Sequence, residues 1–211
     1  SLPATALVIV LRAHIVRVVL GSGAFDWADT RLTAAVLALL CISLFAQAIN
    51  LLMVRAFYAG GHTRIPFFVT LGGSVFAVMF TLWLSSMYAA HPTFVYVLQN
   101  LMRVEGVEGS EIMVLALGYS IAIVLQTAVL GLLAVRKFSI PTAWFWPNVG
   151  RALAAAIMGG FASYSTLNFF VEGINETSFL GILIQGALGG ILGVSGVVIT
   201  YFILRSPELK E

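Results

Sequence analysis

Long apolar runs separated by short polar segments dominate the pattern of this chain. The runs are continuous rather than alternating at every second residue, so they predict helices and not the strands of a membrane barrel. A helix needs about 20 apolar residues to cross the bilayer core. We therefore expect an all-α polytopic membrane protein with about six transmembrane helices in a single bundle over residues 1–211. The expected spans are residues 2–20, 32–54, 66–89, 112–135, 149–171 and 179–204.

Composition supports a membrane protein. Hydrophobic residues make up 60% of the chain and charged residues only 9%, with a mean hydropathy of +1.02. A soluble domain carries about 25% charged residues. The net charge of +2 is too small to indicate a nucleic-acid partner. The single cysteine, Cys41, cannot form an internal disulfide.

The first expected span contains two arginines, Arg12 and Arg17. An arginine at the centre of a membrane helix costs about 2.5–3.5 kcal/mol on insertion scales. We therefore expect this helix to begin upstream of Ser1, so that both arginines lie near a water interface. The chain would then be the C-terminal part of a longer, transporter-like protein.

The segments between the spans form two alternating sets of opposite charge. One set has seven basic and two acidic residues, a net charge of +5, and the other has four basic and seven acidic residues, a net charge of −3. Basic residues mark the cytoplasmic side of a membrane protein, so the first set and the C-terminus are expected in the cytoplasm. The basic set contains Arg55, Arg64, Arg136, Lys137, Arg151, Arg205 and Lys210, with Glu208 and Glu211.

The segment "AGGHTRIP" at residues 59–66 predicts a tight cytoplasmic turn. Gly60 and Gly61 allow the backbone to reverse sharply. Thr63 is a possible N-cap for the next helix, and Pro66 fits its first turn.

Two outward-facing connections also carry structural signals. In the first, Asp26 or Asp29 can cap the following helix by accepting free backbone N–H groups. In the second, "TFVYVLQNLMRV" at residues 93–104 is expected to form an amphipathic helix on the outer surface.

Several of these segments, in this order, resemble the C-terminal portion of the MurJ/MviN-type lipid II flippases of the multidrug/oligosaccharidyl-lipid/polysaccharide exporter (MOP) superfamily. The segments are "LP" at 2–3, "IVRVVLGSGAFDWADT" at 15–30, "RAFYAGGHTRIP" at 55–66 and "GVEGSEIMVLALGYSIA" at 106–122. By motif the resemblance covers about residues 1–137, and beyond that only by hydropathy. It implies the last six of fourteen helices, with the N-terminal half of the same transporter as partner.

The two arginines of the 55–66 segment, Arg55 and Arg64, are expected at the level of the lipid headgroups. One role for them is to fix topology by anchoring to any lipid phosphate. The other is contact with the pyrophosphate of an entering lipid substrate, which arginine can bind through two parallel hydrogen bonds.

Polar residues inside the expected spans form stripes. Ser43, Gln47 and Asn50 share one face of the second span because they are spaced at i, i+4 and i+7. Such residues either form interhelical hydrogen bonds or line a hydrophilic transport cavity. Both readings remain open from the sequence.

The last two spans are rich in small residues with four-residue spacing, which allows two membrane helices to approach closely. In the resembling family the final two helices form a groove thought to hold the lipid tail. These residues are therefore candidates either for helix packing or for a lipid-tail groove. They are Gly160, Gly186, Gly189, Gly190 and Gly193.

No catalytic motif, metal-ligand spacing or cofactor signature is recognisable, so we expect a transporter rather than an enzyme. The resemblance implies a lipid II flippase of the bacterial inner membrane, which acts in peptidoglycan biosynthesis, cell-wall biogenesis and cell shape. Its partners would be a lipid-linked cell-wall precursor and membrane lipids. Alternatives are an exporter of another polyprenyl-linked oligosaccharide or of drugs in the same superfamily, and a membrane scaffold that keeps the fold without transport.

Overall fold

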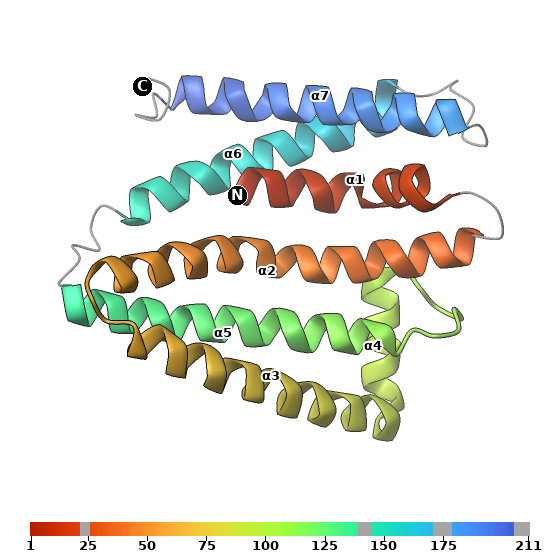
Figure 1. Cartoon of the computed structure of the whole chain (residues 1–211). Helices are drawn as coiled ribbons and strands as arrows, with labels where there is room; N and C mark the ends of the chain where they lie inside the picture. The colour runs from red at the N-terminus through yellow and green to blue at the C-terminus, as the bar shows by residue number, and fades with distance from the viewer. Residues whose placement is uncertain (22–25, 139–144, 171–178, 205–211) are drawn as a thin grey trace. The chain divides into compact units, whose positions relative to one another are not determined.

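The computed structural model describes residues 1–21, 26–138, 145–170 and 179–204, and most of these residues lie in helices (Figure 1). The helices are α1 (Leu2–Leu20), α2 (Trp27–Ala59), α3 (Arg64–Ala90), α4 (Pro92–Met102), α5 (Ile112–Phe138), α6 (Phe145–Ser165), a short π-helix η2 (Thr166–Phe170) and α7 (Phe179–Ile203). The all-α class expected from the sequence is confirmed.

The chain divides into two compact units. The first comprises Ser1–Ala34 and Ala143–Glu211, and the second comprises Ala35–Thr142. In the first unit, α1 packs against both α6 and α7, and α6 packs against α7 along much of its length (Figure 1). The first unit is therefore a three-helix group that joins the start of the chain to its last two helices.

In the second unit, α3 packs along α5, and α2 is tied to α5 by hydrogen bonds. The short helix α4 runs across the end of α3 where that helix finishes (Figure 1). An amphipathic helix in the 93–104 segment was expected, and α4 is that helix.

Five described helices are long and apolar enough to cross a membrane: α1, α2, α3, α5 and α7. The remaining expected span, 149–171, corresponds to α6 and η2. With 21 residues α6 is long enough, but Asn148, Arg151 and its many small residues make it less apolar than the other five. The protein is a multi-pass membrane protein, and the crossing by α6 stays a prediction.

The two arginines of α1 lie at different depths. Arg17 is in the last turn of the helix, near its end at Leu20, as expected for a residue close to an interface. Arg12 lies eight residues before that end, about 12 Å deeper at 1.5 Å per residue. There its guanidinium donates to the carbonyl of Ile9, 3.4 Å away. The expectation that both arginines lie near a water interface stays a prediction.

Local hydrogen bonds set the start of α2. At its start, the backbone N–H of Asp29 donates to Oδ1 of Asp26 at 2.9 Å, and the N–H of Asp26 donates to Oδ2 of Asp29 at 3.1 Å. This reciprocal pair is a capping box, and it confirms the expected cap. The expected cap on α3 is wrong in part, because Thr63 occupies the N-cap position without a capping hydrogen bond from its side chain.

Candidate functional site

The basic turn between α2 and α3 is held by a Schellman motif. The N–H of His62 donates to the carbonyl of Phe57, and the N–H of Gly61 donates to that of Tyr58. Gly61 has φ +74°, a left-handed conformation that favours glycine. The tight reversal expected at the two glycines is therefore present, and it places Arg55 and Arg64 at the same end of the second unit.

A buried apolar cluster lies next to this turn. Phe57, Leu130 and Ala134 are fully buried and hold the ends of α2 and α5 together, with side chains of α3 packed around them. The Phe138 ring lies 5.2 Å from that of Phe57, centroid to centroid. A Cβ on Gly60 would come within 2.8 Å of the Phe138 ring, so this glycine is needed for close approach.

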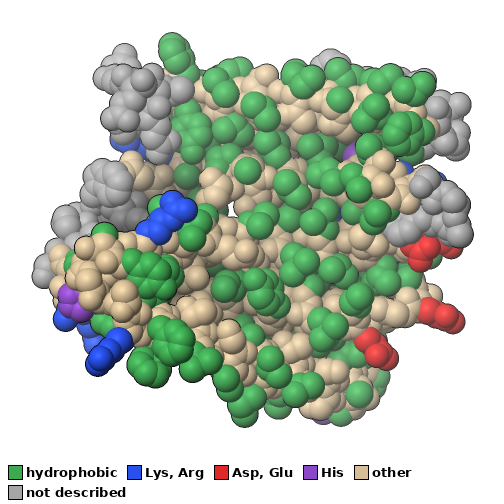
Figure 2. Space-filling model, in the orientation of Figure 1, with side chains coloured by type: hydrophobic (Ala, Val, Ile, Leu, Met, Phe, Trp, Pro, Cys, Tyr) green, Lys and Arg blue, Asp and Glu red, His purple; other side chains and the backbone are tan. Residues whose placement is uncertain are grey.

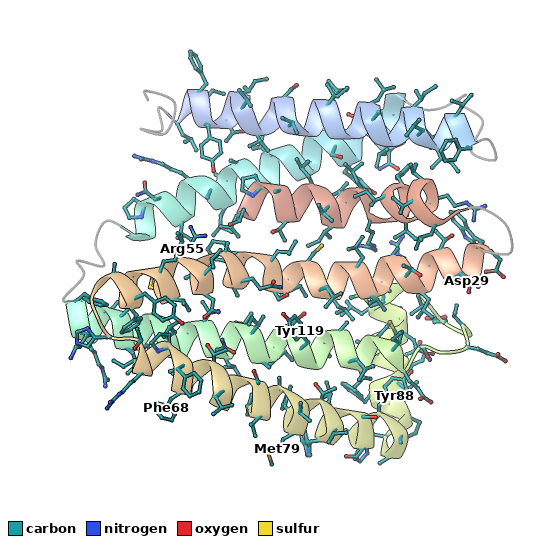
Figure 3. The ribbon with its side chains drawn as sticks, viewed as in Figure 1. Asp29, Arg55, Phe68, Met79, Tyr88 and Tyr119 are labelled. Atoms are coloured by element: carbon teal, nitrogen blue, oxygen red, sulfur yellow. The ribbon has the colours of Figure 1, made fainter. Side chains whose placement is uncertain are left out.

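Arg55 precedes this turn in the chain and Arg64 follows it, and both side chains are exposed. Arg136 and Lys137, in the last turn of α5, lie at the same end of the unit and are also exposed. Figure 3 shows Arg55 near one end of α2 and Asp29 near the other. In the part of Figure 2 where α2, α3 and α5 lie, basic side chains gather at one edge and acidic ones at the opposite edge. The structure thus places four residues of the predicted basic set, Arg55, Arg64, Arg136 and Lys137, at one exposed end of the second unit. Arg205 and Lys210 lie outside the described residues.

The polar stripe of α2 is partly bonded within its own helix. The Ser43 hydroxyl donates to the carbonyl of Leu40 at 2.7 Å, and the Gln47 amide donates to the Ser43 oxygen at 2.9 Å. The Asn50 side-chain oxygen is enclosed and has no hydrogen-bond partner among the described residues. Asn50 is therefore the stripe residue with a buried oxygen that still lacks a hydrogen bond among the described residues.

The hydroxyl groups of α5 make the interhelical bonds to α2. Ser120 donates to the Leu39 carbonyl at 2.8 Å, and Thr127 donates to the Ala46 carbonyl at 3.1 Å. Neither Ser120 nor Thr127 is among the site residues predicted from the sequence. Their seven-residue spacing, two helical turns on one face, is the signal that could have found them.

Glycines allow polar side chains to pass between α3 and α5. A Cβ on Gly73 would collide with the Gln126 amide, and one on Gly118 would collide with the Thr81 hydroxyl. Beside the first contact lies an open apolar groove of about 430 Å³, with Phe68, Gly72 and Phe76 on α3 among its lining residues. The two helices are thus joined by glycine contacts that the sequence analysis assigned only to the last two spans.

The glycine face of α7 is divided between two neighbouring helices. A Cβ on Gly186 would lie 3.2 Å from Cβ of His14 in α1, and one on Gly190 would lie 3.7 Å from Cδ1 of Leu11. Gly189 meets Leu11 and the Leu167 side chain of η2, both at little more than 3 Å. Gly160, on α6, has only a loose contact with Val10 of α1.

Gly193 is the most tightly enclosed of these glycines. A Cβ there would collide with the Leu7 side chain and lie 3.0 Å from Cβ of Ser163 on α6. Gly159 and Gly196 complete the contact between α6 and α7, because both backbones approach closely at these positions. The described residues therefore place helix neighbours over this face, and its role toward a lipid tail stays a prediction.

A hydrogen-bond network that the sequence does not predict joins three segments of the second unit. The Tyr88 hydroxyl shares a 2.8 Å hydrogen bond with the Ser110 hydroxyl, and the Gln99 amide donates to both oxygens, at 3.3 and 2.8 Å. The network joins the end of α3, the middle of α4 and the loop before α5. Figure 3 shows Tyr88 where α3 and α4 meet. Residues so far apart in sequence give no local pattern from which such a network could be found.

Comparison with known families extends the motif resemblance. The family model described as lipid II flippase MurJ matches residues 1–184 of this chain. The chain belongs to the MurJ lipid II flippase family. The match continues past the quoted motifs, through α6 and into the first turns of α7. No curated protein and no solved structure matches the chain.

Proposed function

We propose that this protein moves lipid II from the cytoplasmic to the outer leaflet of the bacterial inner membrane, by alternating access and without covalent chemistry. The observation that carries the proposal is the family match over residues 1–184, which includes most of the described helices. The N-terminal half of the same transporter is the proposed structural partner.

The geometry of the basic turn supports an entry role for Arg55 and Arg64. Both guanidinium groups are exposed at the end where the charge distribution predicts cytoplasm. The Schellman turn and the Phe57 cluster fix the backbone that carries them. A pyrophosphate has several oxygens that an arginine fork can bind in pairs.

Replacing each arginine tests this role. In cells depleted of their own lipid II flippase, Arg55→Ala and Arg64→Ala are expected to reduce lipid II exposure on the outer leaflet at least about tenfold, because a charge-assisted hydrogen bond contributes about 1.5–3 kcal/mol. Arg→Lys is expected to restore only part of the activity, since lysine lacks the planar fork. Lys137→Ala is the matched control, which removes one exposed cation from the same end.

The outcomes separate the alternatives. Normal transport in both alanine variants, at normal protein level, would leave these arginines with an anchoring role only. An equal loss in the Lys137→Ala control would indicate a general charge effect. If the unaltered protein restores no lipid II exposure while it is inserted at normal level, the lipid II assignment fails, and an exporter of another lipid-linked glycan or a scaffold takes its place.

A further inference from the structure

A small cavity lies in the first unit, between the end of α1, the start of α7 and the start of α2. Its volume is about 160 Å³, and it is lined by Ala13, His14, Arg17, Trp27, Ile182 and Gln185. A single water needs about 10–15 Å³ of such space, so the cavity has room for a tetrahedral group with several oxygens. Nothing in the proposed entry role of Arg55 and Arg64 uses it.

His14 contributes an enclosed polar atom to this region. Its Nδ1 is buried and has no hydrogen-bond partner among the described residues. The residue packs against α7, because the missing side chain of Gly186 leaves room for its Cβ. A buried ring nitrogen without a partner is costly, and the His14 side chain that carries it is part of the cavity lining.

Arg17 is held in place at the same cavity. Its guanidinium lies 5.7 Å from the centroid of the Trp27 ring, a cation–π distance, and donates to the Thr30 hydroxyl at 3.3 Å. The contacts come from the first turn of α2, whose own start is fixed by the capping box. The positive charge is therefore oriented before any ligand arrives, which lowers the entropy lost on binding.

The position along α1 indicates which ligand fits. Arg17 lies three residues from the end of α1 at Leu20, about 5 Å along the helix axis. That is the depth of the lipid headgroups rather than of the hydrocarbon core. The groups around the cavity are a fixed cation, an imidazole and the Gln185 amide, all able to donate hydrogen bonds.

We propose that this cavity binds the phosphoryl group of a membrane phospholipid from the outer leaflet. Arg17 supplies the charge, and His14 and Gln185 supply neutral donors. A carboxylate would use the same donors less fully, because a phosphoryl group offers more oxygens to three converging side chains. The site is separate from Arg55 and Arg64, which belong to the other unit.

Histidine labelling gives a direct test. The chain has three histidines, His14, His62 and His91, so the ring signals of the intact protein in a phosphate-free maltoside can be assigned by single substitutions. Phosphatidylglycerol is expected to shift the His14 signal and leave that of His91 unchanged, whereas His62 lies between Arg55 and Arg64 and is not used as the reference. Diacylglycerol, which lacks the phosphate, is expected to shift none of them.

A pair of arginines on one helix provides the matched control. Arg17→Gln is expected to raise the apparent Kd for phosphatidylglycerol about tenfold or more, and Arg17→Lys by less, because each removes part of a charge-assisted contact. Arg12→Gln removes the same charge from the same helix outside the cavity and is expected to leave the Kd within about twofold.

Three results would overturn the proposal. The first is an unmoved His14 signal with phosphatidylglycerol. The second is an equal loss of binding in Arg12→Gln and Arg17→Gln. The third is an equal His14 shift with inorganic phosphate at the same concentration, which would make the site one for a free anion. If Arg17→Gln does not fold, Arg17→Lys and the lipid titration of the unaltered protein still decide the matter.

Discussion

At the scale of single residues, neighbouring glycines on α7 have very different surroundings. Gly193 is enclosed by Leu7 and by Ser163, whereas the nearest side-chain atom to a Cβ on Gly190 would be Leu11 Cδ1, at an ordinary contact distance of 3.7 Å. Both positions look alike in the sequence, since each takes part in a four-residue spacing of small residues. What distinguishes them is how closely the next helix approaches.

This difference predicts unequal effects of the same substitution. Gly193→Leu is expected to lower thermal stability by about 1–3 kcal/mol, because the new side chain would be forced into an occupied contact. Gly190→Leu is expected to cost clearly less. Thermal unfolding in detergent, measured with protein level in the membrane, checks both variants. Equal stability of the two would show that the tight α6–α7 contact at Gly193 is not formed in the protein.

Transport measured on the same samples tests the lipid-tail groove. If this face only packs against helices, the transport by each variant should follow its protein level. If it also holds a lipid tail, Gly190→Leu should lose transport while its level and stability stay normal, because leucine would occupy the space of the tail. Normal transport at normal level in Gly190→Leu would exclude Gly190 from such a groove.

The sequence could show which residues are small but not which helix each one meets. The i, i+4 spacing placed Gly186, Gly189, Gly190 and Gly193 on a common surface. It could not reveal that Gly186 faces α1 and that Gly193 lies close to both α1 and α6, because the crossing of helices depends on the whole unit. For the same reason Gly73 and Gly118, in a different pair of helices, went unnoticed.

At the scale of elements, caps rather than hydropathy decide where the helices end. The apolar run predicted a span at 32–54, but α2 covers Trp27–Ala59, 33 residues and about 50 Å. The extra turns exist because the Asp26–Asp29 capping box and the Schellman turn at Gly61 lie outside the apolar run. Both signals are visible in the sequence, but hydropathy alone does not extend the span as far as they do.

The buried network under α4 makes a prediction for that helix. Tyr88→Phe removes a hydroxyl bonded to Ser110 and Gln99, and is expected to cost about 1 kcal/mol, since those two still bond to each other. Backbone amides of α4 should then exchange with solvent faster than before. Hydrogen exchange measured by mass spectrometry on peptides covering residues 92–102 checks this.

The matched control for that prediction is Tyr96→Phe. Tyr96 is on α4 itself but 62% exposed, and no described residue shares a hydrogen bond with it. Its replacement should leave exchange in α4 unchanged. If Tyr88→Phe also leaves exchange unchanged, the network does not hold α4 in place, and the apolar contacts of Leu98 must do so.

At the scale of the whole molecule, the arrangement of charge predicts the sides of the membrane. Thr63→Cys should react with an impermeant thiol reagent only from the cytoplasm, and Glu108→Cys only from outside, in a Cys41→Ala background. Both positions are exposed, which makes the comparison fair. The reverse pattern would refute the side assignment.

Topology rules predict the side on which a loop lies but not which of its residues are exposed. Ser110 lies in the same acidic loop and would serve equally well by charge, but it is buried and bonded to Tyr88. A cysteine there would react slowly from either side. The number of apolar spans and their charge bias follow from composition, whereas exposure within a loop depends on distant residues.

The low apolarity of α6 has a consequence for how the chain enters the membrane during synthesis. If α6 crosses the bilayer, inserting Arg151 and Asn148 costs free energy. The apolar residues of α6 offset that cost less than those of the other five helices would. Gly159 and Ala162 are covered by α7, which follows α6 in the chain. Insertion of α6 is then completed only when α7 has left the ribosome, so the two helices would be integrated as one hairpin rather than one after the other.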